Sequence, residues 1–134
     1  TMERAQAIYA YITANVEYDQ LYYSDFSSMP YASQTALGAL RDGTAICGGY
    51  SNALKLLFEM AGIECYNVTG SYFSENHMWN IANIDGQWLW FDATSDRGMS
   101  PEYGFLRFAL TDLDTVKYTW DPKSVELLTG QSIE

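Results

Sequence analysis

Histidine and cysteine are scarce in this chain, and their scarcity limits the chemistry that it can carry. The 134 residues include one histidine, His77, and two cysteines, Cys47 and Cys65. Two cysteines are too few for a disulfide framework, and without further histidines they cannot complete a four-ligand zinc site. We therefore expect no metal and no other cofactor, and any imidazole base has to be His77.

Basic residues and long hydrophobic runs are also missing. Seven lysines and arginines stand against 17 acidic residues, which gives a net charge of −10. Nucleic-acid binding needs a basic surface, so we expect no nucleic-acid partner. No apolar run approaches the roughly 18 residues of a membrane span, so we expect no membrane insertion. No signal peptide is visible, and the start at Thr1 suggests a domain excised from a longer protein.

The residues that are present favour one folded domain over 1–134, because 48% of them are hydrophobic and 16% are aromatic. Apolar residues at helical spacing predict a helix from Glu3 to about Glu17 and a largely buried one from about Cys47 to Ala61. Between them we expect a loop over residues 19–30 and a short helix that Ser33 caps and Asp42-Gly43 ends.

Strand patterns follow the second long helix. Aromatic and β-branched residues predict strands over 65–73, 77–84 and 87–94, a further strand over 104–110, and a polar end after Asp121-Pro122. Asp85-Gly86 is typical of a type I′ hairpin turn, since both central residues need a positive φ. Helices followed by an antiparallel sheet indicate an α+β fold.

The hairpin places His77 near a carboxylate. If the turn is Asp85-Gly86 alone, Ile84 pairs with Gln87, and His77 and Asp92 become diagonal neighbours on one face, about 7–8 Å apart at the backbone. That face also carries Trp79, Trp88 and Trp90, so we expect it to be the core face on which the Cys47 helix packs. An unpaired carboxylate there would be costly, so Asp92 needs a partner such as His77.

Cys47 opens the predicted helix, where unpaired amides and the helix dipole favour a thiolate. Gly48 and Gly49 let a substrate backbone come close, and the amide of Cys47 can point at a developing oxyanion. A thiolate, an imidazole and an orienting carboxylate are the parts of nucleophilic acyl transfer. A buried, inert cysteine is the alternative reading of Cys47, and Cys65 is better explained as a core residue.

These residues resemble a known family. The stretch ICGGYSNALKLLFEMAGIECYNVTG and the later NHMWNIANIDGQWLWFDAT are similar to the core of the transglutaminase-like superfamily. The resemblance implies a papain-like α+β fold, with Cys47 as nucleophile, His77 as general base and Asp92 as its orienting partner. Gly48 and Leu37 depart from the family's usual pattern, and Gln34 is the candidate side chain for the oxyanion hole. Trp79 is a further candidate for contact with substrate.

The resemblance implies a protein or peptide substrate, attacked through a thioester that water or an amine resolves, and it favours an extracytoplasmic, bacterial setting. Two alternatives stay open. One is a catalytically silent binding module of the same fold that acts at the cell surface through the tyrosine-rich segment 18–31, and an unreactive Cys47 or a Cys47–Cys65 disulfide would favour it. The other is a different acyltransferase with the same triad, such as an arylamine N-acetyltransferase. The oligomeric state is left open.

Overall fold

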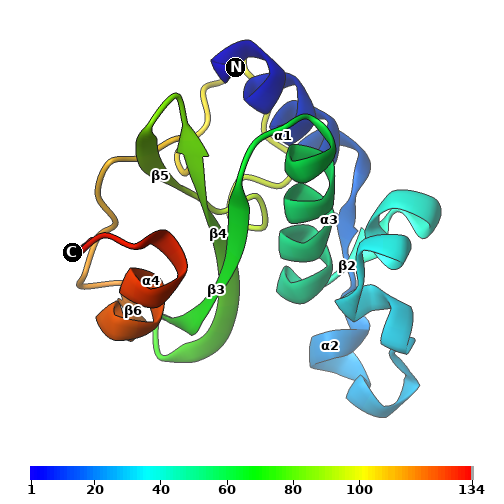
Figure 1. Ribbon diagram of the computed structural model, residues 1–134. Helices are drawn as coiled ribbons and strands as arrows, with labels where there is room; N and C mark the ends of the chain where they lie inside the picture. The colour runs from blue at the N-terminus through cyan, green and yellow to red at the C-terminus, as the bar shows by residue number, and fades with distance from the viewer. Residues whose placement is uncertain (134) are drawn as a thin grey trace.

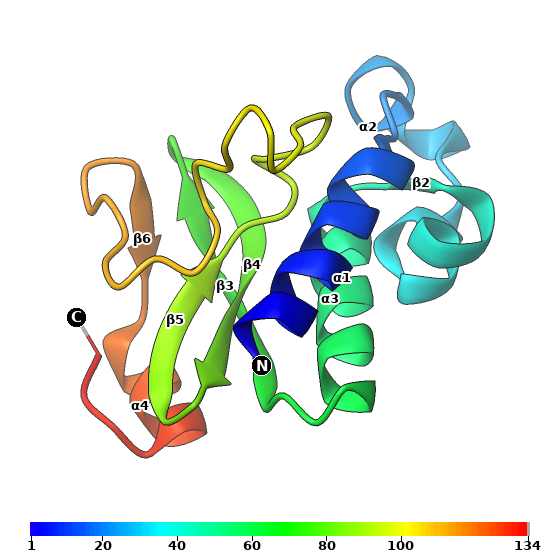
Figure 2. The ribbon, with the colours of Figure 1, turned by 90° about the horizontal axis from the view of Figure 1, so that it is seen from above.

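Helices and a sheet form three layers in the computed structural model, which describes residues 1–133. Helices α1 (Met2–Asn15) and α3 (Cys47–Met60) cover one face of a four-stranded antiparallel sheet, and α4 (Pro122–Thr129) covers the other face (Figures 1 and 2). Both long helices predicted from the sequence are confirmed, with ends within two residues. The α+β fold is confirmed as well.

The sheet has the strand order β5-β4-β3-β6, formed by β3 (Cys65–Tyr72), β4 (Glu75–Ile84), β5 (Gln87–Phe91) and β6 (Tyr118–Trp120). Ile84 pairs with Gln87, and Asp85 and Gly86 have φ values of 54° and 93°, so the predicted turn and register are confirmed. β5 ends at Phe91, three residues earlier than predicted, and the chain then leaves the sheet.

The two faces of the sheet bury different clusters, and the sequence prediction assigned α3 to the wrong one. Ala53, Leu54 and Phe58 of α3 pack against the face that carries Ala82, Leu89 and Phe91. The tryptophan face instead packs against the C-terminal segment. Its core consists of Val68, Trp79, Ile81, Trp88, Trp90, Leu113, Tyr118 and Val125. Both faces are apolar, so alternation along the strands could not show which one receives α3.

The segment between α1 and α3 is built from short turns. It contains β1 (Glu17–Tyr18), α2 (Leu21–Ser24), η1 (Phe26–Ser28), η2 (Tyr31–Gln34), η3 (Gly38–Asp42) and β2 (Thr44–Ala45). The expected loop over 19–30 is therefore partly helical. Ser33 does not cap a helix, because its hydroxyl donates to the buried Asp19 carboxylate at 2.6 Å. Gly43 ends η3 with a φ of 71°, as predicted.

The C-terminal part departs most from the prediction. Residues 104–110 form no strand, and Leu110 makes an isolated bridge to Trp90. The stretch after Asp121, expected to be an irregular polar end, is α4. Asp121 accepts a hydrogen bond from Lys123 N at 3.0 Å, and Pro122 is the first helical residue. Val125 anchors this short helix in the tryptophan cluster.

We expect Gly70→Ala to destabilise the fold, because Gly70 lies where β3 pairs with both β4 and β6. A Cβ there would lie 2.0 Å from the Thr119 carbonyl oxygen and 2.9 Å from the Trp79 ring. The free energy of unfolding, measured by urea denaturation, should fall by about 1–3 kcal/mol. Thr69→Ala, at the exposed neighbouring position, is the control, and equal stability of the two variants would contradict this account of the strand packing.

Candidate active site

Cys47 is the first residue of α3, with Ile46 as the extended N-cap residue. Hydrogen bonding to the N-cap begins at Gly49 N and Tyr50 N, which both donate to the Ile46 carbonyl oxygen. The amides of Cys47 and Gly48 precede these donors, as expected for the first turn of a helix. Gly49 is buried, and a Cβ there would lie 2.6 Å from the Ser33 carbonyl oxygen. Glycine at 49 therefore serves the packing of this helix end.

His77 and Asp92 lie together as the hairpin register predicts. His77 Nε2 is 2.9 Å from Asp92 Oδ2, and the two side chains are 11% and 1% exposed. The contact leaves Nδ1 as the ring nitrogen that is not bonded to the carboxylate. The ring stacks on Trp79, with centroids 5.7 Å apart and planes inclined by 25°. Packing and the carboxylate together restrict the orientation of the imidazole.

Asp92 has further donors that the sequence analysis missed. Tyr118 Oη donates to Asp92 Oδ2 at 2.6 Å, and Ser95 Oγ donates to the same oxygen at 2.8 Å. Burial raises the pKa of Asp92, but the hydrogen bonds from His77, Tyr118 and Ser95 outweigh it and hold the pKa below its ordinary value. Ser95 follows Asp92 closely enough for a local turn to signal it. Tyr118 lies in a distant strand, and no sequence pattern connects it to Asp92.

The imidazole of His77 is held in its charged form. Burial lowers the pKa of His77, but the hydrogen bond to Asp92 and the interaction with Cys47 outweigh it, and the pKa rises to about 9. At neutral pH the ring is therefore an imidazolium beside the Cys47 side chain. Cys65 differs, because burial raises the pKa of its thiol to about 12. Both cysteines are free, so the structure has no Cys47–Cys65 disulfide.

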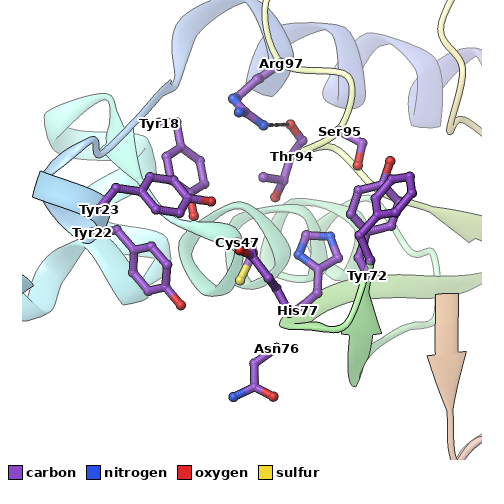
Figure 3. A pocket seen from close by; sticks show the side chains of 12 residues that line it. Tyr18, Tyr22, Tyr23, Cys47, Tyr72, Asn76, His77, Thr94, Ser95 and Arg97 are labelled. Atoms are coloured by element: carbon purple, nitrogen blue, oxygen red, sulfur yellow. Dashed lines mark hydrogen bonds between the residues drawn. The ribbon is translucent and has the colours of Figure 1, made fainter. Parts of the chain in front are cut away.

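Cys47 and His77 lie between two surface depressions. The first, of about 340 Å³, runs between Tyr18, Tyr22 and Tyr23 on one side and Tyr72 on the other (Figure 3), and Phe73 also lines it. Figure 3 shows the Cys47 side chain and the His77 ring side by side among the residues that line it, with Arg97 above them in this view. The second, of about 470 Å³, is lined by the following residues: Tyr22, Gln34, Ile46, Cys47, Gly48, Thr69, Gly70, Asn76, His77 and Met78.

The other predicted site residues are only partly brought to this cleft. Gln34 and Gly48 line the second depression, and Gln34 is exposed there. Trp79 is 1% exposed and lies beneath His77, so its side chain does not reach the accessible surface. Within residues 1–133 no group of three or more histidine, cysteine or acidic side chains could hold a metal ion. No described helix is long and apolar enough to cross a membrane.

Comparison with known proteins defines the class. Residues 1–93 match the family model of the transglutaminase-like superfamily, and the chain belongs to that superfamily. It is similar to a solved TGase structure (TM-score 0.58, 21% identity, covering 67% of this chain and 25% of that one). It is also similar to a candidate cysteine protease from Cytophaga hutchinsonii (TM-score 0.56, 25% identity, covering 78% and 34%). The family match and the likeness to the candidate cysteine protease support a cysteine-dependent enzyme family.

Two mammalian relatives carry the name kyphoscoliosis peptidase. The human protein is 26% identical over 110 residues, which cover 73% of this chain and 16% of the relative. The mouse protein is 26% identical over 131 residues, which cover 89% and 18%. The chain thus spans less than a fifth of the length of these relatives.

The raised pKa of His77 predicts a pH dependence of stability. The pKa rises from 6.5 to about 9 on folding, so the contribution is complete below pH 6.5 and is lost as the pH rises through 9. The urea midpoint should therefore fall between pH 6.5 and 9, and it should fall less in His77→Gln. Because His77 is the sole histidine, NMR of its ring can follow the titration directly. An NMR titration of His77 in the folded protein with a midpoint near pH 6.5 would contradict the prediction.

Proposed function

We propose that this domain hydrolyses peptide amides through a thioester on Cys47, with His77 as the acid and base and Asp92 as the residue that orients His77. The observation that carries the proposal is the His77–Asp92 hydrogen bond beside a cysteine at a helix N-terminus. This arrangement joins a nucleophile, a proton carrier and an orienting carboxylate. The family and the peptidase relatives support the same reaction class.

The first step forms the thioester. The N-terminus of α3 and the His77 imidazolium both favour negative charge on the Cys47 sulfur. The thiolate attacks the carbonyl carbon of the scissile amide, and a tetrahedral oxyanion forms. His77 then transfers its proton to the amide nitrogen, the C–N bond breaks, and the amine leaves. Asp92 keeps the ring oriented throughout and stabilises its charge.

The oxyanion would be held by backbone amides. The N–H groups of Cys47 and Gly48 at the first turn of α3 lie beside the nucleophile, where a developing negative charge has the largest interaction with the helix dipole. The exposed side chain of Gln34 lines the neighbouring depression and is the proposed additional donor. Gly48 faces the Gln34 backbone, and a Cβ at 48 would lie 3.3 Å from the Gln34 carbonyl oxygen.

The two depressions would receive the two sides of the scissile bond, since both contain Cys47 and His77. The aromatic walls of the first depression suit an apolar or aromatic side chain of the substrate.

In the second step, neutral His77 deprotonates water, which attacks the thioester carbonyl and releases the carboxylic acid and Cys47. Cys47 is half-buried in an open cleft, so water has access, and we propose hydrolysis ahead of transfer to an amine.

The test is a peptide-library digestion with detection of the acyl-enzyme by mass spectrometry. We expect cleavage, a covalent adduct on Cys47, and a loss of kcat/KM of about a thousandfold or more in Cys47→Ala, His77→Ala and Asp92→Asn. Cys65→Ala is the matched control, because it removes the other, buried thiol and should keep the activity.

The outcomes separate the alternatives. Release of the free acid in the presence of a primary amine supports hydrolysis, whereas an amide product identifies a transferase. A Cys47 that forms no adduct with any peptide and alkylates no faster than Cys65 in the folded protein would overturn the enzyme proposal and favour a binding module.

A further inference from the structure

The oxygen of Asp92 that is hydrogen-bonded to His77 also accepts a hydrogen bond from a tyrosine that lies outside the family-matched region. Asp92 Oδ2 accepts from Tyr118 Oη at 2.6 Å, Ser95 Oγ at 2.8 Å and His77 Nε2 at 2.9 Å. Tyr118 belongs to β6, whereas the family model ends at residue 93. The tyrosine contact is the shortest of the three, and both partners are 1% exposed. A short hydrogen bond to a buried carboxylate is charge-assisted and strong.

The direction of the Tyr118 hydrogen bond is determined by its other partner. Arg107 Nε donates to Tyr118 Oη at 3.2 Å, and the Arg107 guanidinium lies 5.7 Å from the centre of the Tyr118 ring. An arginine can only donate, so the tyrosine oxygen is the acceptor there. The hydroxyl has one proton, so it donates that proton to the Asp92 carboxylate. The chain Arg107 to Tyr118 to Asp92 therefore has one polarity.

The backbone reinforces this chain. Asp92 N donates to the Arg107 carbonyl oxygen at 3.0 Å, so the residue that orients Tyr118 is itself attached to the Asp92 backbone. The Tyr118 ring packs against Trp79, the residue beneath His77, with centroids 5.1 Å apart. Strand β6 thus reaches the site through both the carboxylate and the ring stack.

We propose that Tyr118 is a positioning residue of the active site, which holds the Asp92 carboxylate in the rotamer that His77 requires and shares its charge with the imidazole. This inference rests on the proposed function. Because three donors share Oδ2, each of them weakens the bond that the other two make to it. Tyr118 therefore both orients the carboxylate and moderates the strength of the His77–Asp92 bond.

The test uses Tyr118→Phe, which keeps the ring and removes the donor. The readout is the His77 Nε2 proton in protein labelled with ¹⁵N-histidine, where a sole histidine gives one signal. With one donor fewer on Oδ2, the His77 hydrogen bond strengthens, so this proton resonance should move downfield at neutral pH. Loss of orientation should lower kcat about tenfold while KM changes little, as expected for losing one hydrogen bond to a charged group.

Tyr50→Phe is the matched control. Tyr50 is also fully buried, and its hydroxyl donates to the Val16 carbonyl oxygen at 2.7 Å, far from Asp92 in the hydrogen-bond network. It should cost similar stability and leave the His77 resonance in place. A Tyr118→Phe protein whose resonance and kcat match those of Tyr50→Phe would overturn the proposal, because Tyr118 would then be a packing residue only.

A second variant tests the same hydrogen-bond chain in case Tyr118→Phe does not fold. Arg107→Gln keeps Tyr118 and removes the cation that orients its hydroxyl, and we expect a smaller downfield shift and a smaller loss of kcat. An unchanged resonance in Arg107→Gln contradicts the proposed chain. The two proposals fail separately. A moved resonance in a protein that cleaves no peptide rejects the proposed function alone, whereas cleavage with an unmoved resonance rejects the role of Tyr118 alone.

Discussion

A charged carboxylate that is almost completely removed from solvent organises this structure. Burying Asp92 would be costly without donors, and its three side-chain donors come from three different parts of the chain: β4, the turn after β5, and β6. A second buried carboxylate, Asp96, binds Tyr9 of α1 and the amides of Leu106 and Arg107. Through these two acids the loop that follows β5 connects the sheet to α1 and to the C-terminal segment.

Positive groups lie at the site although the chain as a whole is strongly acidic. The net charge is −10, but His77 and Arg97 line the depression that contains Cys47, together with one acid, Glu75. The His77 imidazolium and the N-terminus of α3 face the sulfur, and Arg97 lines the same depression with its guanidinium 4.7 Å from the Tyr18 ring centre. At physiological ionic strength the field of distant surface acids is screened beyond about 8 Å, so the groups that line the depression, Glu75 included, contribute most to the field there.

The sequence could predict those parts of the site that depend on local patterns. The Asp85-Gly86 turn sets the register of β4 and β5, and the register brings His77 to Asp92. The first turn of a long amphipathic helix places Cys47. The sequence could not predict which face of the sheet packs against α3, because β4 is buried on both sides and has apolar residues on both, such as Trp79 on one face and Ala82 on the other. The helix after Asp121 was missed because its stability comes from a cap and from Val125 in a distant cluster.

The proposed catalytic residues and two of the residues that donate hydrogen bonds to Asp92 come from different parts of the chain. Residues 1–93, which match the family, contain the cysteine, the histidine and the aspartate. Ser95 and Tyr118, which donate hydrogen bonds to the Asp92 carboxylate, lie after that region. The match to the family model identifies the class, whereas the Tyr118–Asp92 hydrogen bond depends on strand β6, which pairs with β3 at Gly70. Gly70 of β3 pairs with His77 of β4 on one side and with Trp120 of β6 on the other, and its lack of a side chain leaves room for the Thr119 carbonyl and the Trp79 ring, so one glycine allows β6 to pack closely beside the site.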